Sequence, residues 1–151
     1  MKSTLQSMLI AAAALSAVPA FAQDKATLDL LVKKGIITAE ERAKMVEVAV
    51  SAAPKGFSVV PGVAAYGAAE SRKWAEHAQK AGAGAVMLLP PNAYRASDDE
   101  VVAHYKEVAR VGIPIIAYNN PFDTKVDLTP KLVSRIADEV PGVVAIKEFS
   151  G

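Results

Sequence analysis

A lysine at the end of an apolar run most constrains this chain. The final residues read Val143-Val144-Ala145-Ile146-Lys147-Glu148-Phe149-Ser150-Gly151. Four consecutive apolar residues are typical of a strand buried on both faces of a parallel sheet. Lysine is seldom buried without a partner, and a desolvated amine has a lowered pKa and attacks carbonyl groups. Lys147 is therefore a candidate nucleophile; the alternative is that it marks where the strand leaves the core.

A second apolar run also has a polar end. Ile115-Ile116-Ala117 is followed by Tyr118-Asn119-Asn120-Pro121, with Tyr118 standing 29 residues before Lys147. A tyrosine hydroxyl at the end of a strand can relay protons to a neighbouring nucleophile. Tyr118 is therefore a candidate proton relay; the alternative is that its amphipathic side chain only fills space.

Strand-like runs recur along the chain with a regular period. They start near Ser58, Val86, Pro114 and Val143, 28 or 29 residues apart. Alternating strands and helices indicate βαβ units, a parallel sheet and the α/β class. This period is close to that of an eight-stranded β/α barrel of about 250 residues. A doubly wound open sheet is the rival, but the Gly-x-Gly-x-x-Gly turn typical of such folds is absent from the sequence.

Residues that are typical of helix starts and ends lie between these runs. We predict one helix over about 68–81, ended by Gly82. A second follows Ser97, which forms a capping box with Glu100. A third has Thr129 as its N-cap and Pro130 at its first position. The residues expected to face the core are Trp74, Ala75, Ala78 and Ala81 in the first helix, Val101, Val102, Tyr105, Val108 and Ala109 in the second, and Leu132, Val133, Ile136 and Ala137 in the third.

The N-terminus has the pattern of a secretory signal peptide. Lys2 precedes an apolar stretch over 8–18, Pro19 ends it, and Ala20-Phe21-Ala22 has the small-x-small cleavage form. The stretch is too short to span a bilayer. We predict cleavage after Ala22 and a periplasmic or secreted mature chain that is not embedded in a membrane. The alternative is a buried helix of a cytosolic domain.

The segment after the predicted cleavage site is expected to be helical. A short helix over 27–34 is ended by Gly35, and a capping box at Thr38 and Glu41 opens a helix that reaches about Ala52. The predicted organisation is a signal peptide over 1–22, an N-terminal helical segment over 23–57 and a partial β/α barrel over 58–151.

Composition excludes several functions. The 151-residue chain carries a net charge of +1 with interspersed signs, so it lacks the basic surface expected of a nucleic-acid partner. Cysteine is absent, which excludes disulfides and thiolate metal sites. His77 and His104 lie on predicted helices without acidic residues at ligand spacing, so we expect packed or surface histidines and no metal site. Nothing in the sequence calls for a cofactor.

The motifs resemble a known family. The stretches 37–42, 61–67 (Pro-Gly-Val-Ala-Ala-Tyr-Gly), 81–91, 118–121 (Tyr-Asn-Asn-Pro) and 146–151 (Ile-Lys-Glu-Phe-Ser-Gly) match in order. The chain resembles the dihydrodipicolinate synthase and N-acetylneuraminate lyase family, which are β/α barrels. The resemblance covers family strands three to six and implies a partial (β/α)8 barrel of about four parallel strands.

The resemblance assigns roles to two residues. Lys147 would form a Schiff base with pyruvate or a related 2-keto acid, and Tyr118 would shuttle protons at the imine. Both would lie at the carboxyl ends of strands, where barrel enzymes build their sites. The implied activity is a cofactor-free lyase that performs aldol cleavage, condensation or dehydration, expected as a homo-oligomer.

The departures from the family pattern suggest an alternative. The family's Gly-Thr-Thr-Gly-Glu-like turn, which binds the keto-acid carboxylate, has no counterpart where Gly35-Ile36 runs into Ile37-Thr38. In the dihydrodipicolinate synthases an arginine stands where this chain has Asp123, which argues against the lysine-pathway reaction. Relatives are usually cytoplasmic, whereas this chain begins with a signal pattern. The alternative is an exported or truncated family remnant without turnover that has a structural or small-acid-binding role.

Overall fold

The computed structural model describes residues 34–35 and 39–149. The chain divides into two units, 1–38 and 39–151, and the fold described here is that of the second. The predicted signal peptide, the helix over 27–34 and the Thr38 cap fall largely or wholly outside the described residues and stay predictions. The predicted domain boundary at residues 57 and 58 also stays a prediction.

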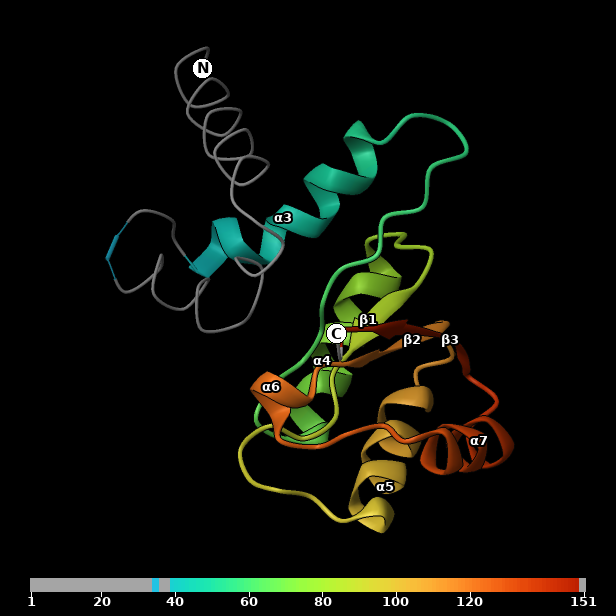
Figure 1. Cartoon of the computed structure of the whole chain (residues 1–151). Helices are drawn as coiled ribbons and strands as arrows, with labels where there is room; N and C mark the ends of the chain where they lie inside the picture. The colour runs from blue at the N-terminus through green and yellow to red at the C-terminus, as the bar shows by residue number, and fades with distance from the viewer. Residues whose placement is uncertain (1–33, 36–38, 150–151) are drawn as a thin grey trace, which may run out of the picture. The chain divides into compact units, whose positions relative to one another are not determined.

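The described unit alternates helices with short parallel strands. Its helices are α3 (Ala39–Ala52), α4 (Ala68–Lys80), α5 (Asp98–Ala109), α6 (Pro121–Thr124) and α7 (Pro130–Glu139). Its strands are β1 (Val86–Leu88), β2 (Ile115–Asn119) and β3 (Val143–Glu148). The sheet has the order β1-β2-β3, and both pairings are parallel. This order confirms the predicted α/β class with βαβ units (Figure 1).

The prediction of a strand starting near Ser58 was wrong. The described unit has three strands where the sequence predicted four. Only one parallel bridge, Gly62 to Met87, forms there. The backbone still follows β1, since the Val63 amide donates to the Met87 carbonyl at 3.0 Å and the Met87 amide donates to the Pro61 carbonyl at 2.9 Å. Pro61 has no N–H to donate, so a continuous ladder cannot develop at this position.

Helices α5 and α7 begin at the predicted caps. The Ser97 hydroxyl accepts the Glu100 amide while the Glu100 side chain accepts the Ser97 amide, which confirms the capping box of α5. Thr129 accepts the Leu132 amide and Pro130 occupies the first turn of α7. Gly82, just after α4, adopts a φ of 89°, a left-handed conformation that glycine reaches without strain. The helix α6 was not predicted, because four residues are too few for a periodic pattern.

The core lies between one face of the sheet and three helices. Helix α4 packs against α5, and α5 packs against α7 (Figure 1). The fully buried core side chains include Val86, Leu88, Val101, Tyr105, Val108 and Ile115. Tyr105 donates its hydroxyl to the Leu88 carbonyl at 3.0 Å, and burial raises the pKa of this hydroxyl. Ala137, predicted to face inward, is exposed instead.

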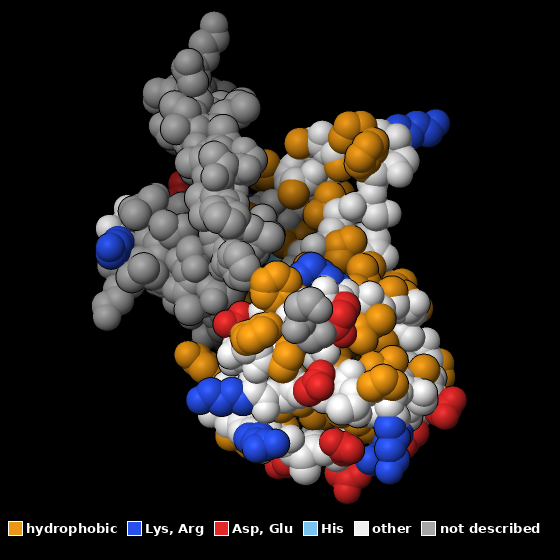
Figure 2. All heavy atoms as spheres, in the orientation of Figure 1, with side chains coloured by type: hydrophobic (Ala, Val, Ile, Leu, Met, Phe, Trp, Pro, Cys, Tyr) orange, Lys and Arg blue, Asp and Glu red, His pale blue; other side chains and the backbone are white. Residues whose placement is uncertain are grey.

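The edge strand β3 is much more exposed than β2. Val144 and Ile146 are 62% and 43% exposed, although the sequence predicted a strand buried on both faces. This is a correction with a simple cause: in the described unit β3 pairs with β2 on one side only, and α7 covers one of its faces. The face seen in Figure 2 exposes apolar side chains among charges of both signs.

Candidate active site at the carboxyl ends of β2 and β3

The two predicted site residues lie together on the sheet. Tyr118 in β2 and Lys147 in β3 are register partners in the parallel pairing. The Lys147 Nζ atom lies 3.4 Å from the centroid of the Tyr118 ring. Because side chains alternate between the faces of a strand, both residues project from the face opposite the buried Ile115 and Ala117. The structure therefore places the candidate nucleophile and the candidate proton relay in direct contact.

Two aromatic rings lie near the Lys147 amine. Besides the Tyr118 ring, the Phe149 ring lies with its centroid 5.7 Å from Nζ. Phe149 in turn meets Phe122 of α6 edge to face, with ring centroids 6.4 Å apart. Ring faces attract cations and exclude water from one side of the amine. Lys147 and Tyr118 are both only partly exposed.

Asn120 connects the Tyr118 hydroxyl to a carboxylate. Its Nδ2 atom donates to the Asp123 Oδ2 atom at 2.5 Å and to the Tyr118 hydroxyl at 3.4 Å. Its side-chain oxygen also caps α6 by accepting the Asp123 amide. Asn120 is 2% exposed, so these partners hold its amide in one orientation. Asp123 thus lies one shared amide group away from the phenol.

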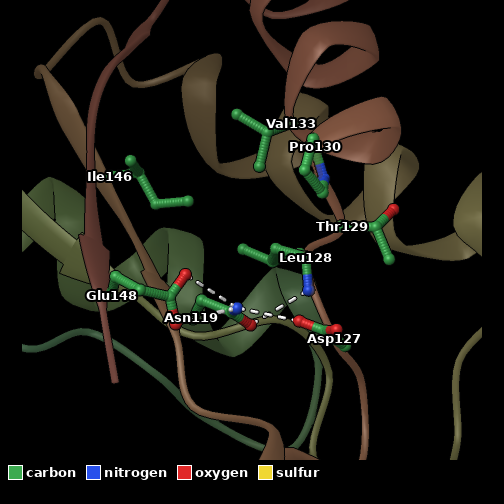
Figure 3. A pocket seen from close by; sticks show the side chains of 8 residues that line it. All are labelled: Asn119, Asp127, Leu128, Thr129, Pro130, Val133, Ile146 and Glu148. Atoms are coloured by element: carbon green, nitrogen blue, oxygen red, sulfur yellow. Dashed lines mark hydrogen bonds between the residues drawn. The ribbon is translucent and has the colours of Figure 1, made fainter. Parts of the chain in front are cut away.

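Asn119 holds the opposite face of the same strand end. It is 1% exposed, and its Nδ2 atom donates to Asp127 Oδ1 at 2.9 Å and to Glu148 Oε1 and Oε2 at 3.2 and 3.0 Å. Its Oδ1 atom accepts the Leu128 amide at 3.0 Å. As Figure 3 shows, these groups line a pocket of about 410 Å³ beside α7. Glu148 points to the opposite face of β3 from Lys147, because successive side chains alternate along a strand.

Sequence reasoning missed the roles of both asparagines. Both lie in the Tyr118-Asn119-Asn120-Pro121 run, in which the sequence indicated a role for Tyr118 alone. One signal was available: two consecutive amides after a buried strand must bind something, because buried polar groups are hydrogen-bonded. The partners themselves, Asp123, Asp127 and Glu148, could not be read from spacing.

His104 and Tyr94 lie among groups that stabilise the fold. His104 is 5% exposed and meets Tyr105 edge to face at 5.8 Å. Burial lowers its pKa to about 4, against a weaker opposing effect of a backbone hydrogen bond at Leu89. Desolvation and the neighbouring Glu100 carboxylate raise the pKa of the Tyr94 hydroxyl. Tyr94 therefore interacts with the α5 cap.

The described part of the chain contains neither a cluster of metal ligands nor a helix that could span a membrane. Over these residues, no group of three or more His, Asp or Glu side chains is placed to hold a metal ion. No described helix combines the length and apolar character that a membrane span requires.

The family model of the dihydrodipicolinate synthetase family matches residues 34–151. The chain belongs to this family. The 4-hydroxy-tetrahydrodipicolinate synthase of Syntrophus aciditrophicus (strain SB) is 35% identical over 113 residues, which are 74% of this chain and 38% of that protein. The chain thus spans well under half the length of the curated relatives that it matches.

Solved structures of the dihydrodipicolinate synthetase family share the fold. The 4-hydroxy-tetrahydrodipicolinate synthase of Methylacidiphilum fumariolicum SolV matches with a TM-score of 0.71 and 26% identity, covering 79% of this chain and 40% of that chain. The Escherichia coli K12 protein YagE, solved in complex with pyruvate, matches with a TM-score of 0.70 and 28% identity over 79% of this chain and 41% of that chain. These relatives are TIM barrels, and the described unit is part of such a barrel.

Proposed function

We propose that Lys147 forms a Schiff base with pyruvate or a related 2-keto acid, and that Tyr118 relays protons at the imine. The observation that carries the proposal is the contact of the Lys147 amine with the Tyr118 ring, 3.4 Å from its centroid, at the carboxyl ends of adjacent parallel strands. Carboxyl ends of strands are where barrel enzymes hold their catalytic groups. Membership of the dihydrodipicolinate synthetase family and the pyruvate complex of YagE support the same chemistry.

The proposed reaction begins with the neutral amine of Lys147. Its nitrogen attacks the C2 carbonyl carbon, the carbonyl oxygen takes up protons and leaves as water, and a carbon–nitrogen double bond remains. The protonated imine draws electrons from C3, so a C3 proton or the C3–C4 bond can break while its electron pair is held as an enamine. The Tyr118 hydroxyl donates a proton to the departing oxygen and accepts one in later steps.

This scheme accommodates three outcomes of lyase chemistry. Addition of the enamine to an aldehyde is condensation, and the reverse is aldol cleavage. Loss of a hydroxyl group from the carbon next to the enamine is dehydration. No metal or cofactor is required, since the lysine itself provides the electron sink.

A second candidate follows from the exposure of β3. Val144 is 62% exposed and Ile146 is 43% exposed, so water reaches the strand that carries Lys147. Lysine amines attack carbonyls where the surroundings exclude water, and an exposed strand does not provide such surroundings. The second candidate is therefore a non-catalytic, exported or truncated family remnant that has a structural role or binds small acids without reacting.

Reductive trapping separates the two candidates. The full chain is incubated with pyruvate, reduced with borohydride and mapped by peptide mass spectrometry. The lyase proposal expects a reduced pyruvyl group on Lys147 that Lys147→Ala abolishes. Lys131→Ala, which removes an exposed lysine of α7, is the matched control and should leave trapping intact. A folded chain that carries no adduct on Lys147 contradicts the lyase and supports the remnant.

We further propose that the segment over 1–22 directs export and that the protein assembles as a homo-oligomer. N-terminal sequencing of the mature protein from a secreting host should begin at Gln23. An uncleaved N-terminus on cytoplasmic protein would contradict export. Sedimentation velocity checks the assembly, and a monomer at all concentrations would contradict it.

A further inference from the structure

An irregularity in β3 precedes the candidate nucleophile. Ile115 pairs with Val143, but the next residue, Ile116, pairs with Ala145, so the register shifts by one residue between them. Val144 is the extra residue of this bulge and is 62% exposed. A bulge leaves its extra residue unpaired and disrupts the ladder locally. The pairing before the bulge therefore does not determine the pairing after it.

A regular ladder would place Lys147 differently. Without the bulge, Val144 would stand opposite Ile116, and Lys147 would stand opposite Asn119 instead of Tyr118. A slip of one residue moves every later side chain to the other face of the sheet. Lys147 would then point toward α7, away from the Tyr118 ring. This competing register restores a continuous ladder, so something must favour the observed one.

Contacts at the far end of β3 favour the observed register. The Asn119 amide donates to both carboxylate oxygens of Glu148, at 3.2 and 3.0 Å (Figure 3). The backbone carbonyl oxygen of Asn119 accepts a hydrogen bond from the backbone amide of Phe149 at 3.0 Å. In the slipped register Glu148 would turn to the other face and lose the Asn119 amide.

Asn119 is a fixed reference point for these contacts. It is 1% exposed, and its side-chain oxygen accepts the Leu128 amide at 3.0 Å while its Nδ2 atom also donates to Asp127 at 2.9 Å. The segment that leads into α7 therefore holds the amide in place. A donor held this way selects where Glu148 docks, because a hydrogen bond to a charged group is stronger than one between neutral groups.

We propose that Asn119 and Glu148 form a register lock, which holds β3 beyond the Val144 bulge so that Lys147 faces Tyr118. Glu148 is a positioning residue in this proposal and does not touch substrate. The importance of the lock for catalysis rests on the proposed function of Lys147. The register itself does not, so it can be measured separately.

Engineered disulfides measure the register directly. The chain has no cysteine, so introduced pairs report without background. The pair Ile116→Cys with Ala145→Cys joins partners of the observed register, and Ile116→Cys with Val144→Cys joins partners of the slipped one. Facing residues of neighbouring strands fall within the Cα separation that a disulfide requires. With Glu148 intact, mild oxidation should give a higher yield of the first disulfide than of the second.

Glu148→Ala tests the lock with little risk to folding, because Glu148 is exposed. The ratio of the first to the second disulfide should fall about tenfold, as expected from losing a hydrogen bond to a charged group. Glu148→Gln keeps an acceptor oxygen and should retain most of the ratio. Glu76→Ala, which removes a glutamate paired with Arg72 on α4, is the matched control and should leave the ratio unchanged.

Deletion of Val144 provides a rescue. It removes the bulge, so a regular ladder then pairs Lys147 with Tyr118 without the lock. In the Glu148→Ala background the deletion should restore the Ile116→Cys with Ala145→Cys disulfide. The deletion remains informative if Glu148→Ala alone unfolds the chain. Recovery of folding and of this disulfide in the double variant supports the lock, and absence of that recovery overturns it.

Pyruvate trapping on Lys147 separates this proposal from the proposed function. Trapping should fall in Glu148→Ala and return with the Val144 deletion, in parallel with the disulfide ratio. An unchanged disulfide ratio in Glu148→Ala overturns the register lock whatever the trapping result. A ratio that changes as expected, with no trapping in any background, supports the lock and contradicts the lyase.

Discussion

Lys147 and Tyr118 are register partners on adjacent parallel strands, and the lysine amine lies against the ring, 3.4 Å from its centroid. The Tyr118 hydroxyl has a separate partner, because Asn120 donates to it at 3.4 Å. The ring and the hydroxyl of one tyrosine therefore have different neighbours. A substitution that removes only the hydroxyl can separate the contribution of each.

Tyr118→Phe should leave an adduct on Lys147 that can still be trapped, but should slow the proton transfers at the imine. The ring that contacts Lys147 remains, so borohydride should still trap pyruvate on the lysine. Exchange of the pyruvate methyl protons with solvent deuterium, followed by NMR, should slow by about 10²–10⁴-fold, the usual contribution of a general acid–base group. Tyr94→Phe, at an exposed tyrosine beside Glu100, is the control and should exchange normally. Equal exchange rates in Tyr118→Phe and the unsubstituted chain would remove Tyr118 from the relay.

Asp123→Asn should improve the use of anionic aldehydes as second substrates. The Asp123 carboxylate lies one amide group away from the Tyr118 hydroxyl. Its negative charge there would repel the carboxylate of a substrate. Removing this charge should raise kcat/KM for aldehydes that carry a carboxylate by about tenfold, from the Coulomb energy of nearby charges. Uncharged aldehydes are the control, because their kcat/KM should not change. An equal gain for both classes would show that the effect is not electrostatic.

The free energy of unfolding should decrease as the pH is lowered, because of His104. Its pKa in the folded chain is lowered to about 4, whereas an unfolded histidine titrates near 6.5. The unfolded chain therefore binds a proton over a range in which the folded chain does not, and stability is lost as pH falls from about 6.5 to 4, by about 3 kcal/mol in total. His104→Gln should lose less between pH 7 and pH 5, measured by urea denaturation. Identical losses in both chains would show that another group carries the dependence.

Ser97→Ala should weaken the start of α5. The Ser97 hydroxyl accepts the Glu100 amide and donates to the Glu100 carboxylate at 2.8 Å. Its loss should lower the free energy of unfolding by about 1 kcal/mol, the usual cost of removing an N-cap. Ser134→Ala is the contrasting control, because the Ser134 hydroxyl only returns to the Pro130 carbonyl within α7. Equal urea midpoints for the two variants would contradict the importance of the cap.

Local features of the fold could be predicted because their causes are local in the chain. The Ser97 and Thr129 caps depend on residues within one helical turn, and both are confirmed. The expected strand near Ser58 was wrong, because Pro61 interrupts the ladder that the apolar pattern suggested. The exposure of Ala137 was also missed, since the periodicity of a helix does not say how widely its neighbours cover it.

The candidate site was predictable only in part, for a related reason. Lys147 and Tyr118 could be named because each is a polar residue at the end of an apolar run, and parallel strands bring such ends together. The partners of Asn119 and Asn120 depend on loops that fold back over the sheet. Asp127, eight residues after Asn119, and Glu148, 29 residues after it, meet at one amide that no spacing rule identifies.

The sequence by itself determined where α5 and α7 begin and which strand ends carry polar side chains, because a helix cap acts over a few residues. It also determined that Lys147 and Glu148 face opposite ways, because side chains alternate along a strand. Only the tertiary structure decided which face Lys147 takes. That choice depends on the register of β3 beyond Val144, and register is settled by contacts between segments distant in the chain. The Glu148 carboxylate on the buried Asn119 amide is one such contact, and it holds the lysine against Tyr118.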